Sequence, residues 1–378
     1  MIDNSDMLVF WAVVLGRLLI PLLIPRWPLP TILAALVLDG VDQTIFQVFT
    51  DLPLDGYQGY DKALDVYYLT IAYIAAMRNW ANLPAFRVSR FLNYYRLVGV
   101  AAFELSHLRV LLLIFPNTFE YFFIFYEAVR ARWNPLRMGK RMVVIAAAAI
   151  WIVIKLPQEY WIHVAQLDAT DFVKEHIFGA PLTASWAAAL ANRPWVLLLA
   201  AAGLLGLLFL ARWLLASRLP AADWPLKLAA DPLPEEIDER HEQLAYAAQT
   251  RILRPALLEK FVLVSLVSLI FASFLPTVRA TSVQLYAAIA LVIGVNALLS
   301  HWLALRGRGW ESVAREFAVM ALVNLGIVYL ADLLLRRGGA ALSLQLPLFF
   351  VLLLTLIVTL YDRYRVIYDV RRAQGGVV

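Results

Sequence analysis

Two aspartates one helical turn apart lie in an apolar stretch near the start of the chain. Asp39 and Asp42 share a helix face with Gln43, because residues three and four positions apart are neighbours on a helix. In a low dielectric, two such carboxylates raise each other's proton affinity, and a shared proton or bound cation relieves the repulsion. The pair suits a proton relay, a cation site or a magnesium-bound diphosphate. The alternative is a structural polar cluster satisfied by Arg96 or Lys155.

Further ionisable residues follow in later apolar stretches. Glu120 lies in the run 110–128, where a carboxylate facing inward is what a hydrophilic pathway needs. Lys155 and Glu159 are spaced i, i+4 in the next run, and His163 follows one turn later. This spacing predicts a Lys155–Glu159 ion pair. Glu159 and His163 are also candidates for metal binding or proton transfer, since histidine titrates near neutral pH.

Glu104 and His107 form a Glu-x-x-His pattern, which di-iron carboxylate bundles use in two copies with two further glutamates. Here there is one copy, so most of such a site is lacking. A haem would need two histidines facing each other at one depth, and His107 and His163 are the candidate pair. The chain has no Cys, which excludes Cys-ligated metals, disulfides and thiol catalysis. The cofactor remains unassigned.

The elements that must position these residues are apolar helices. The composition is 62% apolar and 16% charged, whereas soluble domains are about half apolar and about a quarter charged. Stretches long enough to cross a bilayer recur, and they predict an all-α, polytopic integral membrane bundle of about 11 transmembrane helices. The stretches are 8–25, 29–49, 63–79, 90–106, 110–128, 141–162, 194–216, 260–277, 282–304, 314–335 and 341–361.

The chain divides at its one long polar stretch. Residues 1–216 are expected to form an N-terminal membrane bundle of about seven spans, which holds most of the ionisable residues within spans. Residues 260–378 are expected to form a C-terminal membrane bundle of about four spans and a short tail. Between them, residues 217–259 are interpreted as a cytoplasmic linker with an amphipathic helix from Pro234. This linker either packs on the bundle or docks a partner protein.

The placement of Lys and Arg predicts the orientation. These residues concentrate in alternate loops and in the final tail, which the positive-inside rule assigns to the cytoplasm. The chain is therefore expected in the cell (plasma or inner) membrane, with its C-terminus cytoplasmic and, for an odd number of spans, its N-terminus outside. Arg336 and Arg337 violate the pattern. The same rule accounts for the pI of about 9.3, so we expect contact with the lipid bilayer and none with nucleic acid.

Three classes of function stay open. Ionisable residues within several spans favour a cation- or proton-linked transporter or channel. The pair of Asp39 and Asp42 beside basic residues favours an intramembrane enzyme acting on a lipid or isoprenoid. A non-catalytic membrane subunit or scaffold of a larger complex would need only packing surfaces and the segment 217–259.

Five of the candidate residues are expected to converge on one polar region. A charge that faces lipid at mid-depth costs about 3 kcal/mol even on the mildest scale, so these side chains should point inward. Facing inward, they lower that cost by meeting each other, water or a ligand. The five residues are Asp39, Asp42, Glu120, Lys155 and Glu159.

Overall fold

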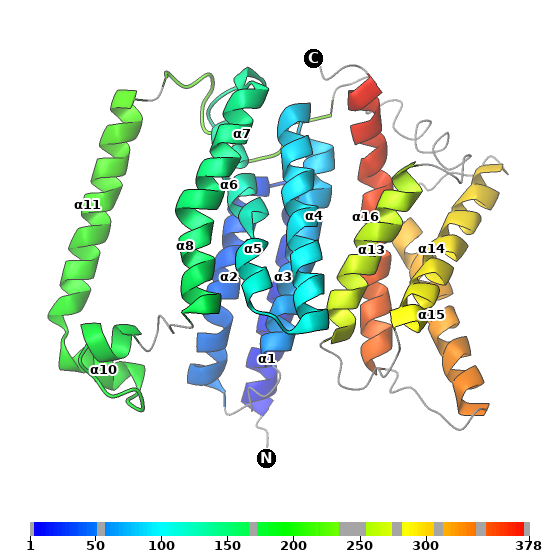
Figure 1. Cartoon of the computed structure of the whole chain (residues 1–378), viewed down its shortest axis with the longest axis horizontal. Helices are drawn as coiled ribbons and strands as arrows, with labels where there is room; N and C mark the ends of the chain where they lie inside the picture. Colours follow the sequence, from blue (N-terminus) through cyan, green and yellow to red (C-terminus); the bar gives the residue numbers. More distant parts are fainter. Residues whose placement is uncertain are drawn as a thin grey trace.

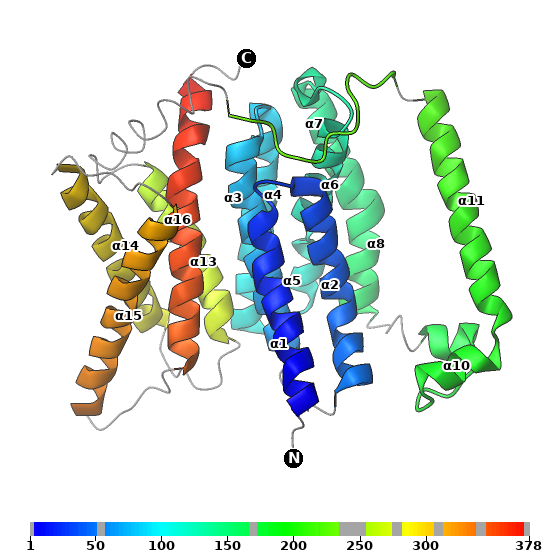
Figure 2. The ribbon, with the colours of Figure 1, turned by 180° about the vertical axis from the view of Figure 1, so that it is seen from behind.

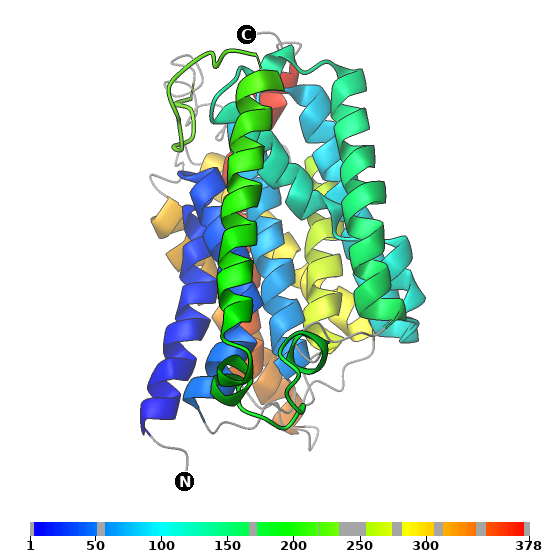
Figure 3. The ribbon, with the colours of Figure 1, turned by 90° about the vertical axis from the view of Figure 1, so that its left-hand side faces the viewer.

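Most of the molecule consists of long helices whose axes are roughly aligned (Figures 1 and 3). The computed structural model describes residues 4–50, 57–165, 172–218, 220–233, 255–273, 282–305, 313–337 and 345–373. Every regular element in these ranges is helical, which confirms the all-α class for this part of the chain. The two termini lie at opposite ends (Figure 1). We call the end near the C-terminus the upper end and the opposite end the lower end.

The first half of the chain runs up and down between the two ends. Pro28 and Pro84 stand in the first turns of α2 and α4, where proline's missing N–H removes no helical hydrogen bond. Asn82 precedes α4, and its side chain accepts a hydrogen bond from the Ala85 N–H. The helices are α1 (Asn4–Leu19), η1 (Ile20–Leu23), α2 (Pro28–Phe49), α3 (Tyr57–Asn79), α4 (Leu83–Ser106), α5 (Val110–Ile114), α6 (Thr118–Arg130), η2 (Pro135–Arg137) and α7 (Lys140–Ala149).

A single rod of mixed winding continues from α7 to residue 164. Its later parts are η3 (Ile150–Lys155), α8 (Leu156–Glu159) and η4 (Tyr160–Val164), of which η3 and η4 are π-helical. Pro157 lies within α8 and cannot donate a backbone hydrogen bond. The wider π turns therefore flank a proline that interrupts the regular ladder. This winding sets where the side chains of the rod point.

One apolar helix stands apart from the rest. After η5 (Val173–Ile177) and α10 (Trp186–Asn192), α11 (Trp195–Arg218) runs alone beside the bundle (Figures 1 and 2). Its described side chains are largely exposed, and Leu198 and Phe209 are each 73% exposed.

The core is centred on α3. Residues 71–77 of this helix are fully buried, and one hydrophobic cluster joins α3 and α4 to α6, α13 and α16. The C-terminal helices thus pack directly on the N-terminal ones (Figure 2). Their bounds are α13 (Pro255–Ser273), α14 (Ser282–Leu305), α15 (Val313–Arg337) and α16 (Gln345–Ala373).

The described helices contain fewer clear membrane spans than expected. Four segments are long and apolar enough to cross a bilayer, and a fifth counts if the pair α10 and α11, bent by 87°, forms one span. The expected count was about 11. The predicted stretches all overlap helices, but several of these helices carry too much charge: α4 alone contains Arg87, Arg90, Arg96 and Glu104. By composition, the described part of the chain supports four to five spans. The four segments are Ser5–Leu23, Pro28–Phe49, Val110–Arg130 and Lys140–Val164.

An extended segment crosses the bundle at its upper end (Figure 2). We call residues 220–233 the strap. Its backbone N–H groups at Asp223 and Lys227 donate to the carbonyls of Arg132 and Ala131, each at 2.9 Å. These bonds tie the strap to the end of α6. The amphipathic helix predicted from Pro234 lies outside the described residues.

Candidate functional site

Five charged side chains from α1, α2 and α3 meet at one point. We call Arg17, Asp39, Asp42, Asp61 and Asp65 the Arg17 cluster. The Arg17 guanidinium forms ion pairs with Asp39 and Asp42 of α2, and lies 2.7 Å from Asp61 and 2.9 Å from Asp65 of α3. Arg17 and Asp42 are buried. One positive charge against four negative ones leaves a formal charge of −3 when all four carboxylates are ionised.

Local sequence spacing explains how the carboxylates reach one guanidinium. Asp39 and Asp42 are three residues apart on α2, and Asp61 and Asp65 are four apart on α3, so each pair occupies one helix face. α1 turns back into α2 through η1 and the residues that follow it, so Arg17, in the last turn of α1, faces α2. The Tyr67 hydroxyl donates to the Leu18 carbonyl at 3.0 Å and fixes α3 beside this point.

Three of the four aspartates have the spacing of metal ligands. Carboxylate oxygens of Asp39, Asp61 and Asp65 all lie within 4.8 Å of one another. No other group of three or more His, Asp or Glu ligand atoms in the described ranges has this spacing. These side chains are 21% to 35% exposed, in contrast to Asp42. Hard divalent cations prefer such oxygen ligands, so the cluster has both the ligands and the access for a cation.

A second group lies deeper, between α3, α6 and η3. We call Tyr68, Asn117, Glu120 and Lys155 the Glu120 cluster. The Tyr68 hydroxyl donates to Glu120 Oε1 at 2.5 Å, and Asn117 Nδ2 donates to Glu120 Oε2 at 2.9 Å. The Lys155 ammonium is 3.9 Å from Glu120 Oε2 and 3.9 Å from the centre of the Tyr121 ring. Glu120 and Lys155 are each 3% exposed, so the ion pair and the ring together replace water around the ammonium.

Tyr68 connects the two clusters. Tyr68 lies three residues after Asp65 on α3. Its hydroxyl donates a hydrogen bond to Glu120, and it interacts electrostatically with both Asp39 and Asp65. Glu120 also interacts electrostatically with Asp39. The Arg17 cluster and the Glu120 cluster are therefore coupled electrostatically, and Tyr68 and Glu120 take part in that coupling.

Glu159 contacts His163, as their i, i+4 spacing predicts, and two further partners that the spacing does not predict. It accepts a hydrogen bond from the Asn117 backbone N–H at 3.0 Å, lies 3.0 Å from His163 Nε2 and lies 3.9 Å from Arg96. The expected ion pair with Lys155 does not form. The Lys155 ammonium lies beside Glu120 instead, and the Glu159 carboxylate is occupied by Asn117, His163 and Arg96.

Other predicted residues lie away from both clusters. Gln43 is exposed on α2 and forms no hydrogen bond with the side chains of either cluster. Glu104 pairs with Lys62 at 3.8 Å rather than with His107. His107 adopts a left-handed φ of 57°, ends α4 and is exposed. Because the chain leaves the helix at His107, the Glu-x-x-His spacing does not bring the two side chains together.

The five residues expected to converge divide among separate polar groups, which interact electrostatically with one another. Asp39 and Asp42 belong to the Arg17 cluster, Glu120 and Lys155 to the Glu120 cluster, and Glu159 interacts electrostatically with Lys155.

Arg17 is the residue that sequence reasoning missed. Arg96 and Lys155 were the expected partners of the aspartate pair, and Arg17 takes that place. The signal was present, because Arg17 is the one charged residue in the apolar stretch 8–25. The rule that a charge within a span faces a partner applies to it as it does to the acids.

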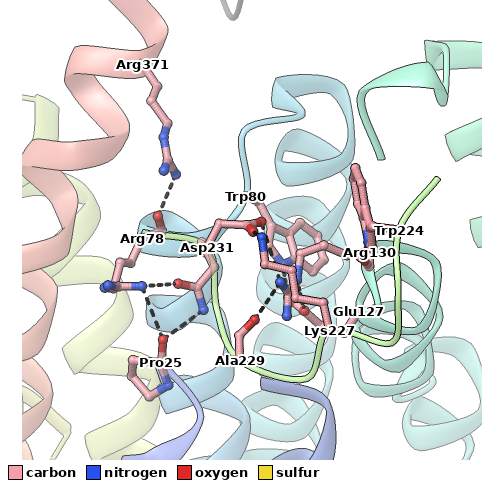
Figure 4. Close-up of polar contacts among 11 residues, drawn as sticks. Pro25, Arg78, Trp80, Glu127, Arg130, Trp224, Lys227, Ala229, Asp231 and Arg371 are labelled. Carbon is pink, nitrogen blue, oxygen red and sulfur yellow. Dashed lines mark hydrogen bonds and ion pairs between the residues drawn. The ribbon is translucent and has the colours of Figure 1, made fainter. Parts of the chain in front are cut away.

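A third polar group closes the upper end beneath the strap (Figure 4). Glu127 of α6 is fully buried; it accepts hydrogen bonds from Trp80 Nε1 at 2.7 Å and from Arg130 Nε at 2.5 Å. Arg130 Nη1 donates to the carbonyl of Ala229, and Trp224 Nε1 donates to the carbonyl of Arg130 at 3.1 Å. The strap is therefore held to α6 by side chains as well as by its backbone.

Basic residues flank the strap on its other side (Figure 4). Arg78 Nη1 donates to the Pro25 carbonyl at 3.3 Å, and Arg371 of α16 donates to the Arg78 carbonyl at 2.6 Å. Burial lowers the pKa of Arg371 to about 10, and the nearby charge of Arg78 acts in the same direction. Arg371 thus remains charged at neutral pH and joins α16 to the end of α3.

The Arg17 and Glu120 clusters together place titratable groups from the exposed aspartates to the buried glutamate. Such an arrangement can bind a cation, share protons or hold a metal-bound anion. The chain matches no protein-family model, no curated protein and no solved structure.

Proposed function

We propose that this chain is a multi-pass membrane transport protein that binds protons or a cation at the Arg17 cluster. The observation that carries the proposal is the set of four carboxylates around one buried guanidinium. Arg17 cannot lose its proton, so its charge is fixed and holds the four carboxylates together. The remaining negative charge is costly inside an apolar bundle, and exchangeable protons or a cation reduce that cost.

The link through Tyr68 supports transport over a static ion site. A hydroxyl both donates and accepts a proton, and Tyr68 donates to Glu120 while lying beside the charges of Asp39 and Asp65. A change in the protonation or cation occupancy of the Arg17 cluster therefore changes the electrostatic environment of Glu120 and Lys155. A transporter needs this kind of coupling between an accessible site and the interior.

The same proposal includes the membrane arrangement. We infer that the charged long helices, such as α3, α4 and α16, cross the bilayer together with the clear spans and give about 11 crossings. Uncharged polar side chains of these helices, among them Thr70, Asn93 and Thr359, are buried in the bundle, which is compatible with an apolar exterior. The base-rich upper end then faces the cytoplasm of a cell membrane.

Proton binding tests the proposal directly. The purified full-length protein is titrated from pH 8 to pH 5 in weakly buffered detergent solution, with and without added sodium or magnesium ions. We expect the added cation to displace protons from the wild type, and Asp39→Asn and Asp65→Asn to lose most of that release. Glu175→Gln is the control, because Glu175 is an exposed carboxylate far along the chain on η5. Identical titrations of wild type and both Asn variants would refute the proposal.

A metal-dependent intramembrane enzyme is the second candidate. The specific observation in its favour is that carboxylate oxygens of Asp39, Asp61 and Asp65 lie within 4.8 Å of one another, beside the guanidinium of Arg17. Magnesium commonly binds through one or two carboxylates plus substrate phosphates. Magnesium binding that requires an isoprenoid diphosphate, with no cation-linked proton release and no ion flux in liposomes, would favour the enzyme.

A further inference from the structure

An apolar groove of about 380 Å³ opens between α4 and α7, away from both clusters. Val88 and Phe91 of α4 form one wall, and Val144, Ala148 and Trp151 of the rod that begins with α7 form the other. The two helices pack against each other, and both begin at the upper end (Figure 1). Phe91 and Val144 are exposed, so the groove opens on the side of the bundle.

Two cations stand at the upper end of the groove. Arg87 and Lys140 are exposed, and neither forms an ion pair or side-chain hydrogen bond with any residue in the described ranges. Lys140 is also the first residue of α7, a helix of 10 residues whose N-cap, Gly139, supplies no side-chain acceptor. The first backbone N–H groups of α7 are thus left for another acceptor, and the helix dipole favours an anion there.

The length of the groove matches a lipid chain in one leaflet. From Lys140 to Trp151 the rod rises by about 16 Å at 1.5 Å per residue. The hydrocarbon region of a bilayer is about 30 Å thick, so one leaflet accounts for about 15 Å. An acyl chain entering from the upper end would reach Trp151 near the bilayer centre.

We propose that this groove binds an anionic phospholipid, with an acyl chain between α4 and α7 and the phosphate between Arg87, Lys140 and the first turn of α7. Charge complementarity selects this occupant, because a zwitterionic lipid fills the groove but leaves the two cations without a net counter-charge. Basic pockets between membrane helices recognise anionic headgroups by this chemistry. The proposal does not depend on the function of the Arg17 cluster.

Lipid retention by the full-length protein tests the site. The protein is equilibrated with equal amounts of phosphatidylglycerol and phosphatidylcholine in detergent, and bound lipid is counted by native mass spectrometry. We expect the wild type to retain phosphatidylglycerol about tenfold better, which corresponds to about 1.4 kcal/mol. The double variant Arg87→Gln/Lys140→Gln should lose this preference, and Ala148→Trp, which fills the groove, should lose both lipids.

Arg141→Gln is the matched control, because Arg141 is the next residue on α7, is exposed and does not line the groove. Its phosphatidylglycerol binding should equal that of the wild type. The proposal is wrong if Arg141→Gln loses as much as the double variant, or if the two lipids are retained equally. It is also wrong if inorganic phosphate displaces phosphatidylglycerol at equal concentration and Ala148→Trp has no effect, since the site would then take free phosphate.

Discussion

At the scale of single residues, the choice of arginine at position 17 is the central chemical fact. A guanidinium presents five N–H donors in a planar fork, whereas a lysine presents three from one atom. Each terminal nitrogen of the fork contacts both helices: Nη1 pairs with Asp42 of α2 and Asp61 of α3, and Nη2 pairs with Asp39 of α2 and Asp65 of α3. Arg17 therefore fixes the positions of the aspartates and neutralises part of the cluster's negative charge.

Removing this guanidinium should destabilise the fold. We expect Arg17→Gln to lower the free energy of unfolding by about 3 to 5 kcal/mol, because it leaves the buried Asp42 without its counter-charge. Adding Asp42→Asn should restore part of that loss. Thermal unfolding in detergent measures both, with Arg132→Gln, an exposed arginine, as the control. A wild-type melting temperature for Arg17→Gln would mean that the aspartates are already neutralised without Arg17.

Tyr68 and Tyr67 allow a matched test of the link between clusters. Tyr68→Phe keeps the ring but removes the hydrogen bond to Glu120, and Tyr67→Phe removes a hydrogen bond to the Leu18 carbonyl. Each should cost about 1 to 3 kcal/mol if a buried acceptor is left unpaired. Only Tyr68→Phe should also change cation-linked proton release. Equal effects of the two variants on proton release would show that Tyr68 does not couple the Arg17 cluster to the Glu120 cluster.

At the scale of elements, irregular helical segments position the polar interior. The break between α5 and α6 brings the Asn117 N–H to Glu159 and the Phe115 carbonyl to Arg96 at 3.0 Å. The π turns before Pro157 direct Lys155 to Glu120. Both interruptions place side chains that a continuous α-helix would point elsewhere.

A glycine on α4 makes room for the first of these breaks. A Cβ added at Gly99 would lie 2.0 Å from Phe115 Cβ, whereas one added at Gly40 on α2 would meet nothing within 4 Å. We expect Gly99→Ala to destabilise the protein by about 1 to 3 kcal/mol, since overpacking forces Phe115 to move. Gly40→Ala should be neutral or stabilising by up to about 1 kcal/mol, because alanine favours helix. Paired thermal unfolding curves decide this, and equal shifts would contradict the assigned contact.

The strap offers a second test at this scale. Trp224→Ala removes the hydrogen bond from the indole to the Arg130 carbonyl and should release the strap from α6. Hydrogen exchange should then speed up at the amides of Asp223 and Lys227, which donate to backbone carbonyls near the end of α6. Exchange within α13 should stay unchanged. Trp195→Ala, on exposed α11, is the control, and unchanged exchange in the strap would show that its backbone bonds suffice.

At the scale of the whole molecule, the sequence predicted the positions of the helices better than it predicted which side chains contact each other. Long hydrophobic stretches predict helices because, in an apolar environment, a segment must satisfy its backbone hydrogen bonds within itself. The partner of Asp39 and Asp42 was not predictable in this way, because Arg17 is 22 and 25 residues away and tertiary packing brings it close. The expected count of about 11 spans exceeds the four to five that composition supports in the described residues, for a related reason. Whether a charged helix such as α4 crosses the membrane depends on which neighbours cover its polar side.

The orientation of the whole chain gives the last prediction. The strap lies at the base-rich upper end and the segment before α10 at the lower end, so cysteines placed there should face opposite sides of the membrane (Figure 1). The chain has no Cys, so Ala222→Cys and Thr183→Cys each give a single label. Both positions are exposed. In intact cells an impermeant thiol reagent should label Thr183→Cys alone, and after lysis it should label both. Labelling of Ala222→Cys alone in intact cells would show that the chain has the opposite orientation. Equal labelling of both variants in intact cells would show that the two ends lie on the same side of the membrane.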